Sequence, residues 1–223
     1  MMRNFIVLLL LFTLIGCDKK TKEEVKDQKI SKQVELVKHE KTVFNEKKAV
    51  GEFHGQTTKF IVTEFKVFKT IKLGTGIKDA DGYRKAIKDK RMHIGEFAND
   101  ILGNPAFNVA TKETEVDLVI VSVAELGFKD GAKLKDIYTR AKEKGLQLCP
   151  NEVGPQLRLQ YIDQLKGEWL VVGMEPIAVS GDDLRLFNVA HLFYDGLWLD
   201  FNASSHNHIW LGIRRFIFVC PRK

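Results

Sequence analysis

Two histidines separated by one residue, His206 and His208, are the side chains of this sequence whose spacing best suits a metal ion. In an extended segment, residues two apart point to the same side, and imidazole is a common ligand of zinc and copper. Asp200 or His191 could complete such a set. However, the preceding residues 202–205, Asn-Ala-Ser-Ser, are typical of a surface hairpin turn. This turn predicts two exposed histidines and no bound metal.

A second group of polar side chains alternates with apolar ones after Pro155. Period two predicts a strand over residues 156–161. Its apolar face would contain Leu157, Leu159 and Tyr161, and its polar face Gln156, Arg158 and Gln160. Amides and guanidinium groups have fixed hydrogen-bonding geometry, and arginine can bind a carboxylate or phosphate through two bonds. The polar face is therefore either a ligand surface or a solvent face in which Arg158 pairs with Glu152 or Asp163.

Cys149 and Cys220 are each followed by a proline. In an exported protein, such a pair can form a disulfide. The bond would close a loop of about 70 residues and stabilise the fold by ~4 kcal/mol in the chain-entropy model. Two separate buried thiols, each acting as a small apolar side chain, are the alternative.

Motifs for phosphate binding and nucleophilic catalysis are incomplete. Residues 74–76, Gly-Thr-Gly, lack the third glycine of a dinucleotide loop, so a turn with positive φ is expected there. The Gly-x-Ser-x-Gly motif of serine hydrolases is absent. Glu125 and Glu152 could form the carboxylate pair that a glycan hydrolase needs. No cofactor motif occurs, so no cofactor is expected.

Three tryptophans, Trp169, Trp198 and Trp210, fall on expected strands. Outside the cytoplasm, such aromatic faces could stack on the sugars of a cell wall or of surface glycans. Burial in the core is the alternative, because a tryptophan side chain buries a large apolar area. Trp198 lies between two leucines and would face away from both, so we expect it to be the least buried of the three.

The hydrophobic pattern predicts an α+β fold. Residues 51–223 are expected to form a single domain with a mostly antiparallel sheet, two to three helices in its N-terminal half and a C-terminal strand meander. Residues 116–123 are nearly all apolar and predict a central strand buried on both faces. The expected helices cover residues 83–87, 94–102 and 134–141, and the other expected strands cover 59–73, 156–161, 168–174, 183–192, 196–201 and 209–219.

The N-terminus has the pattern of an export signal. Arg3 precedes an apolar run at residues 5–15, which is shorter than the ~20 residues that span a bilayer. Residues 14–17, Leu-Ile-Gly-Cys, resemble the lipobox of bacterial lipoproteins. This resemblance implies removal of residues 1–16, acylation of Cys17 and a lipid-anchored, extracytoplasmic location at a bacterial membrane or envelope.

Residues 17–50 comprise the lipidated cysteine and a charged tether. The segment is rich in lysine and acidic residues, and between residues 18 and 50 it has no glycine, no proline and no sustained heptad. It cannot bury enough apolar surface to fold alone, so a coil or a frayed helix is expected. Its expected role is to space the domain away from the bilayer.

The chain beyond Phe65 resembles, as a whole, a widespread bacterial family that we know only as uncharacterised. The likeness lies in segments such as FKVFKTIKLGTG, DLVIVSVAELGFKDGA and GEWLVVGMEPI. It implies one ancient domain to which the signal and tether were added, and it implies no activity or catalytic residues.

Charge and location restrict the expected partners. The net charge is +6, but no dense basic patch is interleaved with aromatic residues, so nucleic acid is not expected. The leading hypothesis is an extracytoplasmic binding or structural module with a protein or glycan partner, held at the membrane by its N-terminal lipid. The alternative is an envelope hydrolase that acts on the cell wall or on glycans.

Overall fold

The computed structural model describes residues 47–48, 61–62, 65–181 and 183–222. These residues belong to one compact unit, Asn45–Lys223. The expectations for the signal, for Cys17 and for most of the tether lie outside the described residues. Two short strands, β1 (Lys47–Lys48) and β2 (Ile61–Val62), pair antiparallel. In the described part of the chain, no helix combines the length and the apolar character needed to cross a membrane.

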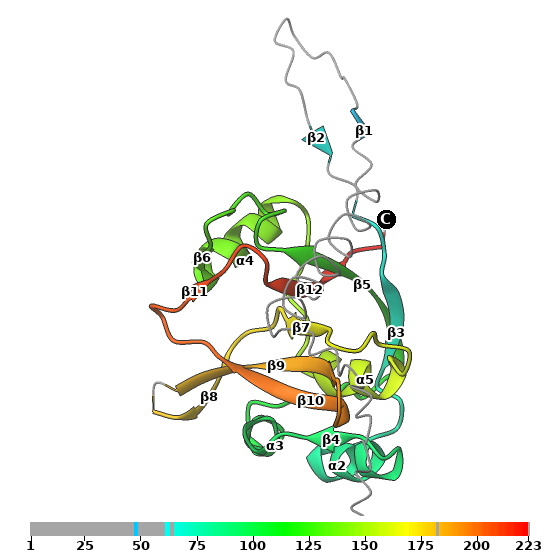
Figure 1. The fold of residues 1–223 in the computed structure, drawn as a ribbon. Helices are drawn as coiled ribbons and strands as arrows, with labels where there is room; N and C mark the ends of the chain where they lie inside the picture. The colour runs from blue at the N-terminus through cyan, green and yellow to red at the C-terminus, as the bar shows by residue number, and fades with distance from the viewer. Residues whose placement is uncertain (1–46, 49–60, 63–64, 182, 223) are drawn as a thin grey trace, which may run out of the picture. The chain divides into compact units, whose positions relative to one another are not determined.

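A curled, mixed sheet of eight strands is the framework of the domain (Figure 1). Its strand order is β3-β5-β12-β7-β9-β10-β4, and β8 pairs with β9 outside this path. The strands are β3 (Lys69–Leu73), β4 (His93–Ile94), β5 (Thr114–Ser122), β7 (Trp169–Val172), β8 (Ile177–Ser180), β9 (Asp183–Leu192), β10 (Gly196–Ala203) and β12 (Arg215–Cys220).

The sheet is mixed, so the prediction of a mostly antiparallel sheet is wrong. Strand β12 pairs parallel with β7, and β4 pairs parallel with β10. The last strand of the chain therefore lies between β5 and β7 and does not simply extend a meander. Successive residues of β12, Phe216, Ile217 and Phe218, are all buried. A strand that is apolar on both faces is stable only in the interior of a sheet.

Four helices are present in the described residues: α2 (Ala80–Asp89), α3 (Glu96–Gly103), α4 (Leu134–Glu143) and α5 (Val153–Gln160). The first three confirm the expected helices. The Asp79 carboxylate accepts a hydrogen bond from the Gly82 amide and so caps α2. Helix α3 ends at Gly103 as expected. The fourth helix, α5, occupies the residues for which a strand was expected.

Helix α5 lies inside the curl of the sheet. It contacts β3 at one end of the strand order and both β9 and β10 near the other end. All residues from Val153 to Leu159 are buried. A helix buried on every side has no solvent face and thus no 3.6-residue apolar period, which is why its alternation resembled a strand. Close packing also requires Gly154, since a Cβ there would lie 2.6 Å from the ring of Phe187.

Another two-stranded sheet lies next to α4 and the start of β12. It pairs β6 (Ala132–Lys133) antiparallel with β11 (Ile209–Trp210). The Trp210 side chain is only 1% exposed and contacts the ring of Phe216 edge-on at 4.9 Å. This packing fixes the segment that leads from β11 into β12.

Candidate functional site

Gln156, which was expected on a ligand surface, is buried beside the carboxylate of Glu152. That carboxylate accepts hydrogen bonds from the Tyr83 hydroxyl (2.6 Å) and from the backbone amides of Gly74 (2.9 Å) and Ala110 (2.8 Å). The Gln156 amide donates to the Tyr83 hydroxyl at 2.8 Å. Burial, assisted by the bond to Glu152, raises the pKa of Tyr83. This polar cluster joins α5 to α2 and to two loops.

The Gly-Thr-Gly segment at residues 74–76 is a turn, as predicted. Gly74 has φ = 64°, and a Cβ there would lie 2.2 Å from the Lys112 carbonyl oxygen. Its amide donates to Glu152, and the Thr75 hydroxyl accepts a bond from Gln156 at 2.7 Å. The Gly74 amide that a phosphate would need is therefore already engaged by a buried carboxylate.

Arg158 is completely buried and binds backbone and amide oxygens. Its Nη1 donates to Gln164 Oε1 at 2.6 Å and to the Ala190 carbonyl at 3.1 Å, while Nη2 donates to the Tyr161 carbonyl. These three described partners are neutral. The guanidinium thus connects α5 to β9 and to the loop after the helix, which is a structural role.

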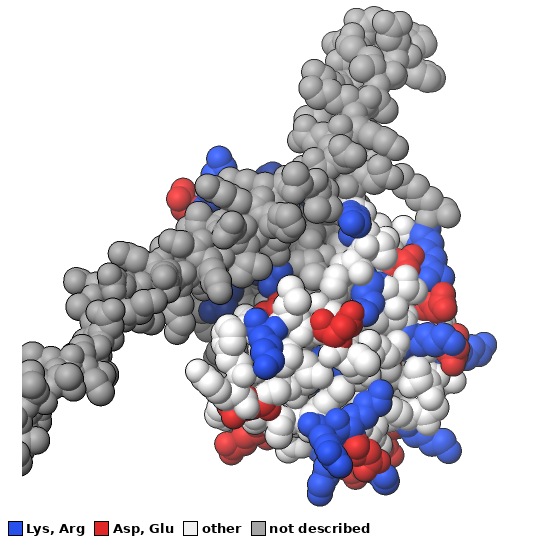
Figure 2. Space-filling view, turned by 45° about the vertical axis from the view of Figure 1, so that its right-hand side comes forward, with Lys and Arg blue, Asp and Glu red and all other residues white. Residues whose placement is uncertain are grey.

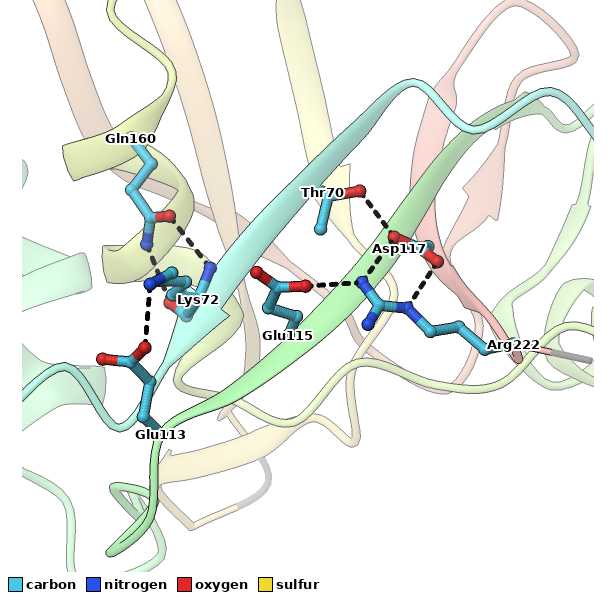
Figure 3. A network of polar contacts seen from close by, with 7 residues as sticks. All are labelled: Thr70, Lys72, Glu113, Glu115, Asp117, Gln160 and Arg222. Carbon is cyan, nitrogen blue, oxygen red and sulfur yellow. Dashed lines mark hydrogen bonds and ion pairs between the residues drawn. The ribbon is translucent and has the colours of Figure 1, made fainter.

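The Gln160 side chain bonds to the backbone of β3, the strand at one edge of the sheet (Figure 3). Its Oε1 accepts a bond from the Lys72 amide at 2.9 Å, and its Nε2 donates to the Lys72 carbonyl at 2.8 Å. Strand β3 is the terminal strand of the order, so this side-chain amide takes the place of a neighbouring strand. Gln160 also contacts Gln156, whereas Arg158 points to β9. The three side chains do not share a face, so the geometry assumed for the ligand surface is wrong.

An ion-pair network covers the outer side of β3 and β5 near the C-terminus (Figure 3). Arg222 donates to both oxygens of Asp117, at 2.8 and 3.1 Å, and to Glu115 at 3.1 Å. The Thr70 hydroxyl also donates to Asp117. These bonds lower the pKa of Asp117 to about 2. Figure 2 shows basic and acidic side chains interspersed over the face it views.

Cys149 and Cys220 are both free thiols in the structure. Cys149 is buried, its sulfur lies 3.4 Å from the Ile217 carbonyl oxygen, and burial raises the pKa of its thiol. Cys220 is half-buried. Oxidation of the pair to a disulfide stays a prediction.

His206 and His208 are exposed in the turn between β10 and β11, as the surface-turn interpretation predicted. The ring of His208 contacts Trp210 edge-on at 4.9 Å. His191 lies elsewhere, with its Nδ1 2.6 Å from the Gln164 carbonyl oxygen. In the described ranges, no three or more His, Cys, Asp or Glu side chains are grouped to hold a metal ion.

Glu125 and Glu152 engage different parts of the fold. The Glu125 carboxylate accepts bonds from the backbone amide and the hydroxyl of Ser122, at 2.6 and 2.7 Å. The Glu152 carboxylate is buried in the cluster with Tyr83. Glu152 binds Gly74 beside the start of β5, whereas Glu125 binds Ser122 at the other end of this nine-residue strand, so the two acids do not form the carboxylate pair that the sequence allowed.

Aromatic side chains from three strands line up across the sheet. The strand register places Trp169 of β7 opposite Ala190, Ala190 opposite Trp198 of β10, and Trp198 opposite His93 of β4. Residues opposite each other on paired strands lie on the same face. We call these four residues the aromatic row. Phe187, three residues before Ala190, packs on α5, so the alternation of side chains along β9 places the aromatic row on the face turned away from that helix.

The rings of the aromatic row differ in their exposure to solvent. Trp169 is 37% exposed, Trp198 is half-buried, and His93 is exposed. Trp198 stacks on His93, with ring centroids 4.6 Å apart and an interplanar angle of 22°. Its indole Nε1 donates to the Asp195 carbonyl at 3.2 Å. Trp169 is therefore more exposed than Trp198, and Trp210 is buried, so the expectation that Trp198 is the least buried of the three tryptophans is wrong.

Two polar side chains lie directly beside the aromatic row. Asn188 of β9 is opposite Asp200 of β10 and Val171 of β7. Asn188 is buried, and its Oδ1 and Nδ2 have no hydrogen-bond partner among the described residues. Burial raises the pKa of Asp200, although its Oδ1 accepts a bond from the Phe201 amide at 2.9 Å. Because Asn188 is completely buried, its amide does not reach the surface of the aromatic row, whereas Asp200 is half-buried.

The sequence pointed to the two tryptophans of this site but missed His93 and Asn188. His93 lies on a strand of only two residues, too short to show a period. Asn188 lies within β9 between buried apolar residues, Leu186 and Phe187 before it and Val189 and Ala190 after it. A polar residue in such a run is the only signal in the sequence that marked it as unusual.

Comparison of the chain with protein-family models, with curated proteins and with solved structures finds no match. The resemblance to a bacterial family therefore stays an expectation. An argument about function rests on the aromatic row and on Asp200 beside it.

Proposed function

We propose that this protein is a bacterial lipoprotein, acylated at Cys17 and held on the outer side of a cell membrane, whose domain binds an envelope polysaccharide. The observation that supports binding is the register of Trp169, Trp198 and His93 across the sheet, beside the half-buried Asp200. No cofactor is part of this proposal.

The aromatic row suits carbohydrate chemically. The C–H face of a pyranose ring is apolar and packs on an indole, while its hydroxyls need oriented donors and acceptors. The Asp200 carboxylate is an acceptor, and the exposed imidazole of His93 offers ring nitrogens that can donate or accept. Binding sites typically combine aromatic surface with a few polar groups in this way.

The spacing of the two tryptophans favours an oligosaccharide. Trp169 and Trp198 are separated by one intervening strand, so their Cβ atoms are roughly 10 Å apart. One sugar ring cannot stack on both indoles at this separation. We therefore expect affinity to rise from monosaccharide to oligosaccharide of the same sugar.

Sedimentation with insoluble cell-wall polysaccharide tests this proposal. We would use the full chain with Cys17→Ala, which removes the acylated residue. Trp198→Ala and Trp169→Ala should each weaken binding roughly tenfold, because each removes one stacking surface. The matched control is Tyr194→Ala, since Tyr194 is an aromatic residue that is 99% exposed and lies outside the aromatic row.

Three results of the sedimentation assay would contradict the proposed binding site or favour another explanation. Equal binding by all variants with unchanged melting temperatures would remove the aromatic row as a glycan site. Loss of binding by Tyr194→Ala as well would indicate non-specific adsorption. Release of new reducing ends from the polysaccharide would favour the hydrolase alternative over a binding module.

A further inference from the structure

Strand β11 and the short loop that joins it to β12 expose three large aliphatic side chains. Ile209 is 47% exposed, Leu211 57% and Ile213 83%. We call residues 209–214 the apolar loop. We propose that the apolar loop docks on the surface of a lipid bilayer that contains anionic headgroups.

The apolar loop is held rigidly in this outward orientation. The Arg214 amide donates to the Leu211 carbonyl at 2.9 Å, and the Ala124 amide donates to the Gly212 carbonyl at 2.8 Å. Gly212 is buried, and a Cβ there would lie 2.3 Å from the Lys129 carbonyl oxygen. Trp210 points into the core while its neighbours at 209 and 211 are exposed. The aliphatic side chains are therefore presented to solvent by a fixed backbone, with no need to reorder on docking.

Cationic side chains border the apolar loop. Lys129, Lys133 and Arg214 are all exposed, and Lys133 lies opposite Ile209 in the β6–β11 register. Two acids are also near: exposed Asp130, next to Lys129, and Glu125, whose carboxylate is bonded to Ser122. Aliphatic residues bordered by cations are the composition that binds a membrane interface, because the chains enter the acyl boundary and the cations meet anionic headgroups.

The inference rests on the proposed lipid anchoring for the presence of a nearby bilayer. The stretch from Cys17 to Phe65 has on the order of 50 residues, so its covalent length allows at most roughly 160 Å between the acyl group and the domain. The apolar loop could therefore reach the anchoring membrane. Lipid contact by the loop itself requires no acylation and can be tested without it.

Fluorescence quenching by brominated lipids measures this contact at a chosen residue. We would place a tryptophan in the apolar loop by Leu211→Trp in the full chain with Cys17→Ala, and compare it with Tyr194→Trp as an exposed control. Vesicles would contain brominated phosphatidylcholine with or without phosphatidylglycerol. The fluorescence of the introduced tryptophan is obtained by subtracting the fluorescence of the chain without that substitution. We expect the Trp at position 211 to be quenched at least about fivefold more than the Trp at position 194, and more strongly when phosphatidylglycerol is present.

A second variant keeps the test decisive. Ile209→Asp with Ile213→Asp, added to Leu211→Trp, should abolish the excess quenching while leaving the melting temperature unchanged, because both side chains are exposed. Equal quenching at positions 211 and 194 would overturn the proposal. So would a blue shift at position 211 that grows with protein concentration in the absence of vesicles, since that would identify a second copy as the occupant. Failure of acylation at Cys17 would overturn the proposed anchoring alone.

Discussion

Arg158 is a buried cation whose three described partners are neutral oxygens from the loop after α5 and from β9. A buried charge is costly unless it is hydrogen-bonded. Both terminal nitrogens of Arg158 have partners, whereas its Nε has none among the described residues. The planar guanidinium reaches partners in different directions, which a lysine ammonium on a single stem cannot do. Residue 158 therefore contributes to stability and not to a ligand surface.

Arg158→Lys should lower the free energy of unfolding by ~2–4 kcal/mol, because carbonyl oxygens in the interior lose their donors. Urea unfolding followed by circular dichroism measures the change. The control is Arg140→Lys, at an exposed arginine paired with Glu143, which should change the free energy by less than ~0.5 kcal/mol. A midpoint for Arg158→Lys equal to that of the parent would contradict this role.

The two cysteines of the domain should differ strongly in reactivity. Cys149 is buried, and desolvation raises the pKa of its thiol, so the reactive thiolate is scarce. Cys220 is half-buried at the end of β12. In the folded Cys17→Ala chain, we expect a thiol reagent to modify Cys220 at least about 100-fold faster than Cys149.

Mass spectrometry of timed samples, taken without reductant, identifies the modified cysteine. Denaturant should equalise the two rates, which serves as the internal control. If neither thiol reacts until reductant is added, the disulfide prediction is correct and the free-thiol state is not the one found in solution.

At the scale of elements, hydrogen bonds from Arg222, which follows β12, connect the C-terminal segment to Glu115 and Asp117 of β5. Arg222 and Thr70 stabilise the ionised form of Asp117, which lowers the pKa of Asp117 to about 2 in the folded protein. In the unfolded chain this pKa returns to about 3.9. The stabilisation is therefore fully present above about pH 4 and is lost as the pH falls towards 2.

Asp117→Asn should lower the melting temperature at pH 6 and have a much smaller effect at pH 2, where Asp117 is protonated in the unfolded chain and about half protonated in the folded protein. Because the network is largely exposed, the difference at pH 6 should be small, about 1–3 °C. Differential scanning calorimetry across this pH range measures it. Asp89→Asn, at an exposed helical pair with Lys85, is the matched control. A difference between Asp117→Asn and the parent that is as large at pH 2 as at pH 6 would rule out the network as its cause.

At the scale of the whole molecule, Cys17 decides where the domain is located under our proposal. Cys17→Ala should abolish incorporation of radioactive palmitate and should shift the protein from the membrane to the soluble fraction or leave it unprocessed. The physical reason is that acyl chains bind through about 0.8 kcal/mol per buried methylene, and the substitution removes all of them. The aromatic-row variant Trp198→Ala is the control and should still be labelled. Continued labelling of Cys17→Ala would disprove the lipobox interpretation.

Local sequence patterns identified most elements of the domain. Helices α2, α3 and α4 have amphipathic spacing, and strands β5, β9 and β10 have apolar or alternating runs bounded by turn residues. The turn at Gly74 and the exposed turn at His206 and His208 were also predictable. Each of these features depends on side-chain periodicity or backbone preference within a short segment.

The sequence by itself thus determined the α and β content, most element positions and the tryptophans of the candidate site. Only the tertiary structure decided that residues 153–160 form a helix, since enclosure by the curled sheet removed the periodicity that identifies a surface helix. It also decided that β12 lies between β5 and β7, and that His93 and Asn188 lie beside Trp198 and Asp200. Strand order and register depend on contacts between distant segments, which no local pattern encodes.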